Sequence, residues 1–132
     1  MSMSSKGTRY RTVEVDGFEV LVGKAAVDND YLTLKVAKPY DLWLHVAAVP
    51  GSHVVVRNPE RLAELPAPVV QRAAEYAAYY SKAREARGKV EVHVCWASDV
   101  RKVRGAPAGE VQLRRYDKVK VYPRALAEGD DE

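Results

Sequence analysis

Polar and apolar residues alternate in short runs along much of this chain, and a period of two residues is the pattern of half-buried β-strands. The clearest case is near the start, where residues 10–15 alternate and residues 18–22 return after Asp16-Gly17. The pair Asp-Gly readily adopts the left-handed backbone of a tight turn. This segment therefore predicts a β-hairpin, which commits the chain to a sheet with antiparallel strands.

Later runs of the same kind extend the expected sheet. They cover residues 42–46, 53–56, 90–96, 110–114 and 118–122. Pro50-Gly51-Ser52 separates the first two runs and favours a second hairpin. The last two runs are expected to pair with each other across residues 115–117 as a third hairpin.

Two segments predict helices. The longer one is rich in alanine and is expected from Pro66 or Pro68 to Arg87. A shorter helix of about two turns is expected over residues 31–37, because Pro39 cannot continue it. The element order indicates the α+β class, with a mainly antiparallel sheet of hairpins packed on one long alanine-rich helix plus a short helix.

The composition is typical of one globular domain, with 47% hydrophobic and 30% charged residues among 132. We divide the chain into a flexible N-terminus (1–8), a domain (9–123) and an acidic flexible tail (124–132). The single cysteine, Cys95, excludes an intrachain disulfide. No apolar run approaches the ~20 residues that cross a bilayer, and the N-terminus lacks a secretory signal, so we expect a cytoplasmic protein with no membrane partner.

Positive charge is concentrated in the second half of the chain. Residues 82–120 contain eleven basic and five acidic residues, whereas residues 1–81 contain nine of each. A basic half indicates a polyanionic partner such as nucleic acid. A surface of ion pairs, as in thermophilic proteins, would give a similar count.

Residues 42–46 place chemically useful side chains on one face of a strand. Leu42, Leu44 and Val46 share one face, so Trp43 and His45 share the other. We expect the second face to be exposed, where an indole and an imidazole stack on RNA bases. The alternative is that Trp43 covers the core.

Phosphate contacts are expected from a turn and from basic side chains. Free amides and the hydroxyl of the Gly51-Ser52-His53 turn form a candidate phosphate nest. The candidate cations are Lys24, Arg57, Lys82, Arg101, Lys102 and Arg104. For residues 101–104 the alternative is a solvated loop.

An enzymatic interpretation depends on Asp41, His45 and His53, which lie within thirteen residues and carry metal-binding or acid–base groups. Their spacing matches no metal-site template. Ser52 and His53 are neighbours on a strand and point to opposite faces, so they do not form a nucleophile and base pair. We therefore predict no catalytic residue, metal or cofactor, and keep an RNA-processing or RNA-modifying enzyme as the alternative.

Several motifs follow one another in an order that resembles the NFACT-R domain, the RNA-binding module of NFACT proteins. They are Leu21-Val-Gly-Lys24, Asp28-Asn-Asp-Tyr-Leu-Thr33, Asp41-Leu-Trp-Leu-His45, Pro50-Gly-Ser-His-Val54, the helix segment ending Ala-Tyr-Tyr-Ser-Lys82, Val100-Arg-Lys and Gly109-Glu-Val. The resemblance covers residues 9–123. Lys24 stands where the family often has arginine, and Val103 where proline is common.

The resemblance implies a role for each matching position. The signature positions are Asn29, Asp30, Asp41, Trp43, His45, Gly51, Ser52, His53 and Val54, and the basic ones are Lys24, Arg57, Lys82 and Lys102. Asn29, Asp30 and Asp41 are expected to order the site rather than to touch RNA. The family's full-length members are ribosome quality-control factors that bind stalled large subunits and tRNA, and at this length we expect a stand-alone module.

The sequence thus predicts a non-catalytic RNA-binding module for tRNA or rRNA, with the large ribosomal subunit as a further partner. A protein-interaction module that docks on a ribosomal or NFACT-like partner is the second alternative. The RNA, the oligomeric state and the process, quality control or tRNA modification, stay open at this point.

Overall fold

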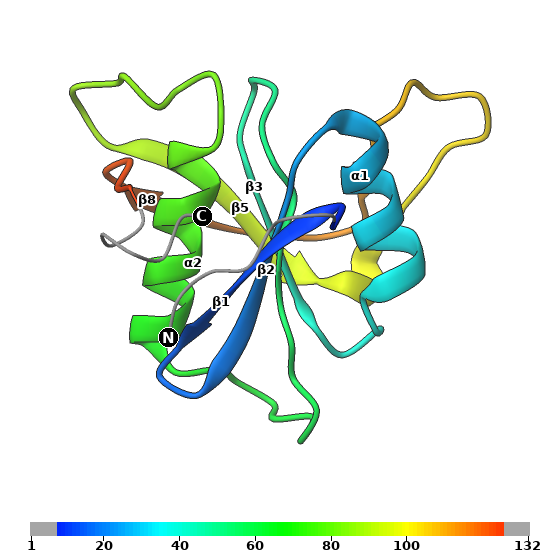
Figure 1. The fold of residues 1–132 in the computed structure, drawn as a ribbon, viewed down its shortest axis with the longest axis horizontal. Coiled ribbons are helices and arrows are strands. Elements are labelled where there is room, and N and C mark those ends of the chain that lie inside the picture. Colours follow the sequence, from blue (N-terminus) through cyan, green and yellow to red (C-terminus); the bar gives the residue numbers. More distant parts are fainter. Residues whose placement is uncertain (1–7, 126–132) are drawn as a thin grey trace.

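A computed structural model describes residues 8–125, so the flexible ends expected over 1–8 and 124–132 fall almost entirely outside the described residues. The main sheet has six antiparallel strands in the order β1-β2-β4-β3-β5-β8 (Figure 1). These strands are β1 (Tyr10–Val15), β2 (Phe18–Gly23), β3 (Leu42–Val46), β4 (Val54–Val56), β5 (Val90–Trp96) and β8 (Asp117–Val121). The helical elements are α1 (Ala26–Tyr31), its π-helical continuation η1 (Leu32–Val36), α2 (Ala67–Tyr79) and the short turn η2 (Ala97–Asp99). A separate ladder joins β6 (Val100–Arg101) to β7 (Gln112–Leu113).

The helices cover both faces of the sheet (Figure 1). Helix α2 packs on one face over a core of valines, leucines and alanines from the strands and the helix. Helix α1 and η1 lie over the other face, where Leu32 joins a smaller core with Leu21, Trp43, Val55 and Cys95. The α+β class predicted from the sequence is confirmed, and the helices form one layer on each side of the sheet. No helix within residues 8–125 has the length and apolar character needed to cross a membrane.

The first hairpin is confirmed, and its turn has the predicted left-handed backbone, with φ of 50° at Asp16 and 87° at Gly17. The second hairpin is also confirmed, because β3 pairs with β4 in antiparallel register. The third hairpin is wrong: β7 pairs with β6, whereas β8 returns to the edge of the main sheet beside β5.

Both helices differ from the sequence prediction in extent. The shorter one begins earlier, at Ala26, where the carboxylate of Asp28 accepts a hydrogen bond from the Ala25 amide at 3.0 Å. The longer one ends at Tyr79 instead of Arg87. The chain leaves the helix because Ser81 forms a β-bridge with Gly51. This bridge draws the residues after α2 onto the loop between β3 and β4.

Gly23 allows α1 to approach β2 closely. A Cβ atom at this position would overlap the side-chain oxygen of Asn29. Replacing Gly23 with alanine should therefore displace α1 and destabilise the fold by about 1–3 kcal/mol, as overpacking of a filled interior does. The measurement is the free energy of unfolding in urea, with Gly88→Ala as the control, because an added Cβ meets nothing within 4 Å there. Equal stabilities for the two variants would contradict this close contact.

Candidate nucleic-acid interface

Four segments lie at the same end of the main sheet, with the 80–89 loop on the α2 side and the 102–110 loop on the α1 side, and we call this region the loop end (Figure 1, top). The loop end comprises residues 23–25, 47–53, 80–89 and 102–110. Backbone contacts connect its parts: the Gly23 amide donates to the His53 carbonyl at 3.0 Å, and Gly51 pairs with Ser81. The loop end contains many of the residues that the sequence singled out.

Asn29 joins helix α1 to the loop between β3 and β4. Its side-chain oxygen accepts a hydrogen bond from the His53 amide at 3.0 Å, and its Nδ2 donates to the Gly51 carbonyl at 3.4 Å. The residue is 6% exposed. A short amide side chain on the first turns of α1, facing a glycine, thus satisfies backbone groups of a neighbouring loop, and the ordering role of Asn29 in RNA binding stays a prediction.

The hydrogen-bonding groups of Ser52 and His53 in the Gly51-Ser52-His53 turn are already engaged within the protein. The Ser52 hydroxyl donates to the Gly23 carbonyl at 2.6 Å, and the Ser52 amide donates to the Tyr80 carbonyl at 2.8 Å. The His53 amide is held by Asn29. The prediction that this turn presents free amides and a free hydroxyl to a phosphate is therefore wrong, because these donors fix the turn in place.

Trp43 lies in the interior with an exposed fraction of 1%, so the prediction of a water-facing indole is wrong. The strand alternation was predicted correctly, but α1 and η1 cover the face that carries Trp43. Its Nε1–H donates to the Thr33 hydroxyl at 3.0 Å. The structure supports the alternative interpretation, in which Trp43 covers the core.

A chain of three hydrogen bonds continues from Trp43 to the 102–110 loop. The indole N–H can only donate, so the Thr33 oxygen accepts it, and the Thr33 O–H donates to Nδ1 of His53 at 2.7 Å. This assignment leaves Nε2–H of His53 to donate to the Gly109 carbonyl at 3.0 Å. The network fits a neutral imidazole, and His53 is 1% exposed.

His45 lies beside these rings. Its ring centroid is 5.9 Å from that of Trp43 and 5.4 Å from that of His53. Burial lowers the pKa of His45 below its ordinary value. The same cause, together with the nearby His45, lowers the pKa of His53 to about 4. Both imidazoles are therefore neutral near pH 7 and add no positive charge for a phosphate.

Asp30 anchors the loop over residues 102–110. Its carboxylate accepts hydrogen bonds from Lys102 Nζ at 3.3 Å and from the Gly109 amide at 3.1 Å. Lys102 Nζ also donates to the carbonyls of Pro107 at 2.6 Å and Glu110 at 3.0 Å. Lys102 therefore organises its own loop, and its charge is shared with Asp30 rather than presented to solvent.

Asp41 and Arg57 lie at the opposite end of the sheet. The Asp41 carboxylate accepts hydrogen bonds from the amides of Lys38 and Asn58, each at 2.8 Å. Its Oδ2 lies 3.0 Å from Nε of Arg57. The structure thus separates these two predicted site residues from Gly51 and His53, at the other ends of β3 and β4.

The cations that stay open to solvent are fewer than predicted. Lys82, Arg101 and Arg104 are exposed, and Lys24 is half-buried. Lys82 continues from the bridge to Gly51, and its amide donates to the Pro50 carbonyl at 3.0 Å. Arg104 stands on the anchored 102–110 loop, while Arg101 lies in β6 just before it. The loop end therefore presents charge on a rigid frame.

The enzymatic alternative requires Asp41, His45 and His53 to converge, but only the two histidine rings are neighbours, and Asp41 lies at the other end of β3. Within residues 8–125, no group of three or more histidine, cysteine or acidic side chains is arranged to hold a metal. Cys95 offers no nucleophile, because burial raises its pKa to about 12.

The sequence reasoning missed several residues on which this site depends. Thr33 and Gly109 connect the interior to the loop, and Asn58 holds the far end of β4 through its contacts with Tyr40 and Leu62. Thr33 and Gly109 lie within the quoted motifs, but no spacing in the chain indicated that both bond the ring of His53.

The fold and the site define a class: an α+β module whose buried polar network holds a basic set of loops. Comparison with known proteins is more specific. The model of the family described as "NFACT protein RNA binding domain" matches residues 8–115, so the chain belongs to this family.

Individual relatives agree with this membership. The chain is 39% identical over 109 residues to the Rqc2 homolog RqcH of Bacillus subtilis and 39% identical over 104 residues to that of Streptococcus suis. These matches cover 83% and 79% of this chain but 18% of each relative, so the chain spans about a fifth of their length. A solved structure, the C-terminal part of the fibronectin/fibrinogen-binding protein from Streptococcus suis, matches with a TM-score of 0.80 at 36% identity. It covers 92% of this chain and 47% of that chain.

The buried histidine makes stability depend on pH. The unfolded state takes up a proton on His53 below pH 6.5, whereas the folded state resists it until about pH 4. The free energy of unfolding should therefore fall by about 3 kcal/mol from this residue as the pH is lowered through that window. Urea unfolding between pH 4 and 7.5 measures it.

A non-titrating variant isolates this contribution. His53→Gln should be less stable at pH 7, because it disturbs the network, and should show a smaller loss of stability on acidification. Gly88→Ala, which adds a methyl group where nothing lies within 4 Å, should keep the pH dependence of the wild type. An unchanged pH dependence in His53→Gln would contradict the burial of a neutral imidazole.

Proposed function

We propose that this module binds tRNA or rRNA through the loop end, without catalysing a reaction, as part of cytoplasmic ribosome-associated quality control. Membership in an RNA-binding domain family and the names of the relatives as Rqc2 homologs support the proposal. The observation that carries it is the set of exposed basic side chains on loops held by the Asn29, Ser52 and His53 contacts.

The balance of charge at the loop end favours a polyanion. Residues 80–89 contain four basic side chains and one acid, Glu85. In the 102–110 loop, Arg104 extends from a segment whose lysine is already paired with Asp30. Cations on a fixed frame lose little entropy on binding, and each phosphate that they neutralise releases counterions.

The predicted binding residues divide into two roles under this proposal. Lys82, Arg101 and Arg104 contact phosphates, and Lys24 contributes to the positive field around them. Trp43, Gly51, Ser52, His53 and Lys102 position the loops from inside, together with Asn29 and Asp30. His45 is half-buried and is assigned to neither role. Asp41 and Arg57 stabilise the opposite end of the sheet.

The electrostatic contacts can be tested by removing two of these charges. Lys82→Ala combined with Arg104→Ala should weaken tRNA binding roughly tenfold and reduce the slope of log affinity against log salt by about 1.5. Lys35→Ala combined with Lys38→Ala is the matched control, because it removes the same charge near the Asp41 end. Titration of labelled tRNA at several salt concentrations measures both quantities.

Two results would contradict the proposal. The first is an absence of tRNA and rRNA binding by the unmodified chain at low salt. The second is an equal loss of affinity in the two double variants, which would indicate net charge rather than a site at the loop end.

One observation favours docking on a protein partner as a second function. Val27, Tyr31 and Leu34 follow a helical spacing on α1 and η1 and are 56%, 37% and 42% exposed. If this stripe docks on a ribosomal protein, Leu34→Ser should weaken binding to ribosomes and leave the affinity for free tRNA unchanged. A parallel loss of both affinities would remove this second candidate.

A further inference from the structure

Part of the main sheet on the α1 side lies outside the small core beneath α1 and η1. In the β5–β8 ladder, His93 lies opposite Lys118 and Glu91 lies opposite Lys120, and directly opposed residues point to the same face. The intervening residues Val90, Val92 and Val94 point to the α2 side, where they join the larger core. The face formed by β5 and β8 on the α1 side is therefore polar, and we call it the tyrosine face for Tyr116, which precedes β8 at the Trp96 end of β5.

Tyr116 and His93 form an aromatic platform on this face. Their ring centroids are 4.1 Å apart with planes inclined by 29°, which is a stacked arrangement. His93 is held from its other side by Glu91, whose carboxylate lies 2.9 Å from Nε2. The hydrogen bond to His93 lowers the pKa of Glu91 below its ordinary value, so this carboxylate is ionised near neutral pH. Tyr116 remains 44% exposed although its ring is fixed.

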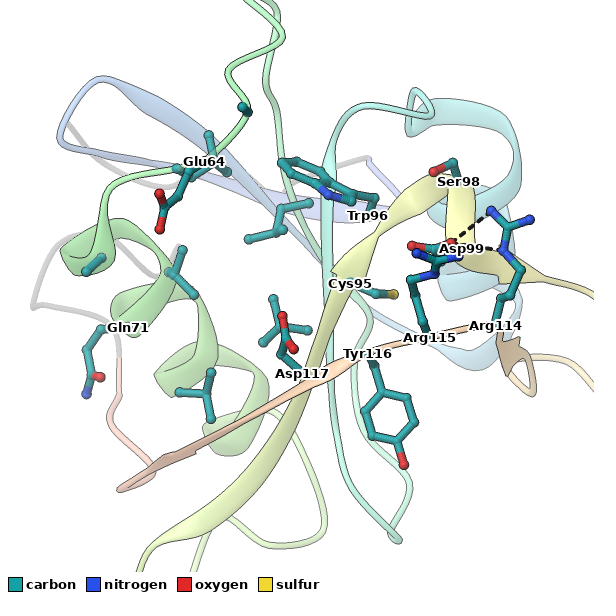
Figure 2. A pocket seen from close by; sticks show the side chains of 17 residues that line it. Glu64, Gln71, Cys95, Trp96, Ser98, Asp99, Arg114, Arg115, Tyr116 and Asp117 are labelled. Atoms are coloured by element: carbon teal, nitrogen blue, oxygen red, sulfur yellow. Dashed lines mark hydrogen bonds and ion pairs between the residues drawn. The ribbon is translucent and has the colours of Figure 1, made fainter.

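Basic side chains surround the platform. Lys118 and Lys120 are exposed on the same face, and Arg115 is 77% exposed next to Tyr116. The carboxylate of Asp117 does not neutralise these cations. Asp117 lies opposite Val94 in the ladder and therefore points to the other face of the sheet. Figure 2 shows Arg114 and Arg115 with Asp99 on the same side of β5 as Tyr116, whereas Glu64 and Gln71 lie on the opposite side.

The chemistry of this surface selects among classes of partner. An interface with protein is usually apolar at its centre and poor in lysine and glutamate, whereas this face has a lysine or a glutamate at three positions around one aromatic pair. Proteins bind single-stranded nucleic acids through flat rings flanked by cations: an unstacked base packs on the ring, and the phosphates contact the cations.

We propose that the tyrosine face is a base-stacking site for single-stranded RNA. One unpaired base stacks on Tyr116, and the adjoining phosphates contact Lys118, Lys120 and Arg115. His45 lies across from His93 in the β3–β5 ladder, so the site continues toward the loop end. The inference rests on the proposed function in taking RNA as the ligand, but it places a second contact outside the loop end.

The test uses a six-nucleotide oligouridine and an abasic strand of the same length and charge as probes. Tyr116→Leu should bind oligouridine about tenfold more weakly than the wild type, the effect of one stacked base. Tyr116→Phe should retain binding within about twofold, because the ring is kept. Tyr40→Leu is the matched control, since the Tyr40 ring packs against Arg61 before β3 and lies outside the tyrosine face. The abasic strand should bind Tyr116→Leu and the wild type alike.

The outcomes separate this inference from the proposed function. If the wild type binds tRNA but Tyr116→Leu binds oligouridine as well as the wild type does, the tyrosine face is wrong and the loop-end site stands. If Tyr116→Leu weakens binding to the abasic strand as much as it weakens binding to oligouridine, the residue acts through charge or folding rather than stacking. This result also overturns the inference. Loss of all RNA binding by the wild type would overturn both.

Discussion

The contact between Asn29 and the backbone of the Gly51–His53 turn is the constraint on which the rest of the structure depends. One side-chain amide joins helix α1 to the β3–β4 loop, and it can do so only because Gly23 has no side chain in the space that Asn29 occupies. Ser52 fastens the same turn to β2 and to the end of α2. Unsatisfied polar groups in such a buried place would cost several kcal/mol, so the network holds the loops in one arrangement.

This network explains why residues with an apparent binding chemistry are inside the protein. The buried hydrogen bonds join the side chains of Trp43, Thr33 and His53 to one another and to the Gly109 carbonyl. Asp30 holds the same loop from the helix side. Under the proposed function the roles are divided: buried polar side chains determine where the loops lie, and the exposed basic residues on those loops contact the RNA.

The sequence predicted local structure well, and failed where distant segments meet. Alternation placed Trp43 on the opposite face from Leu42 and Leu44, which is correct, but a period of two residues does not say what covers a face. The end of α2 was misplaced because the bridge from Ser81 to Gly51 is a long-range contact, whereas helix propensity favours continuation. Motif resemblance identified the family and the network members, yet their partners became visible only in the fold.

Mapping where RNA touches the protein tests the central claim most directly, namely that buried residues set the frame and exposed loops make the contact. Photocrosslinking of bound tRNA, followed by mass spectrometry of the crosslinked peptides, gives this map for the unmodified chain. We expect crosslinks in segments 80–89 and 102–110, with a further site at Tyr116. Crosslinks confined to residues 35–41 or to the outer side of α2, with none on these loops, would contradict the account.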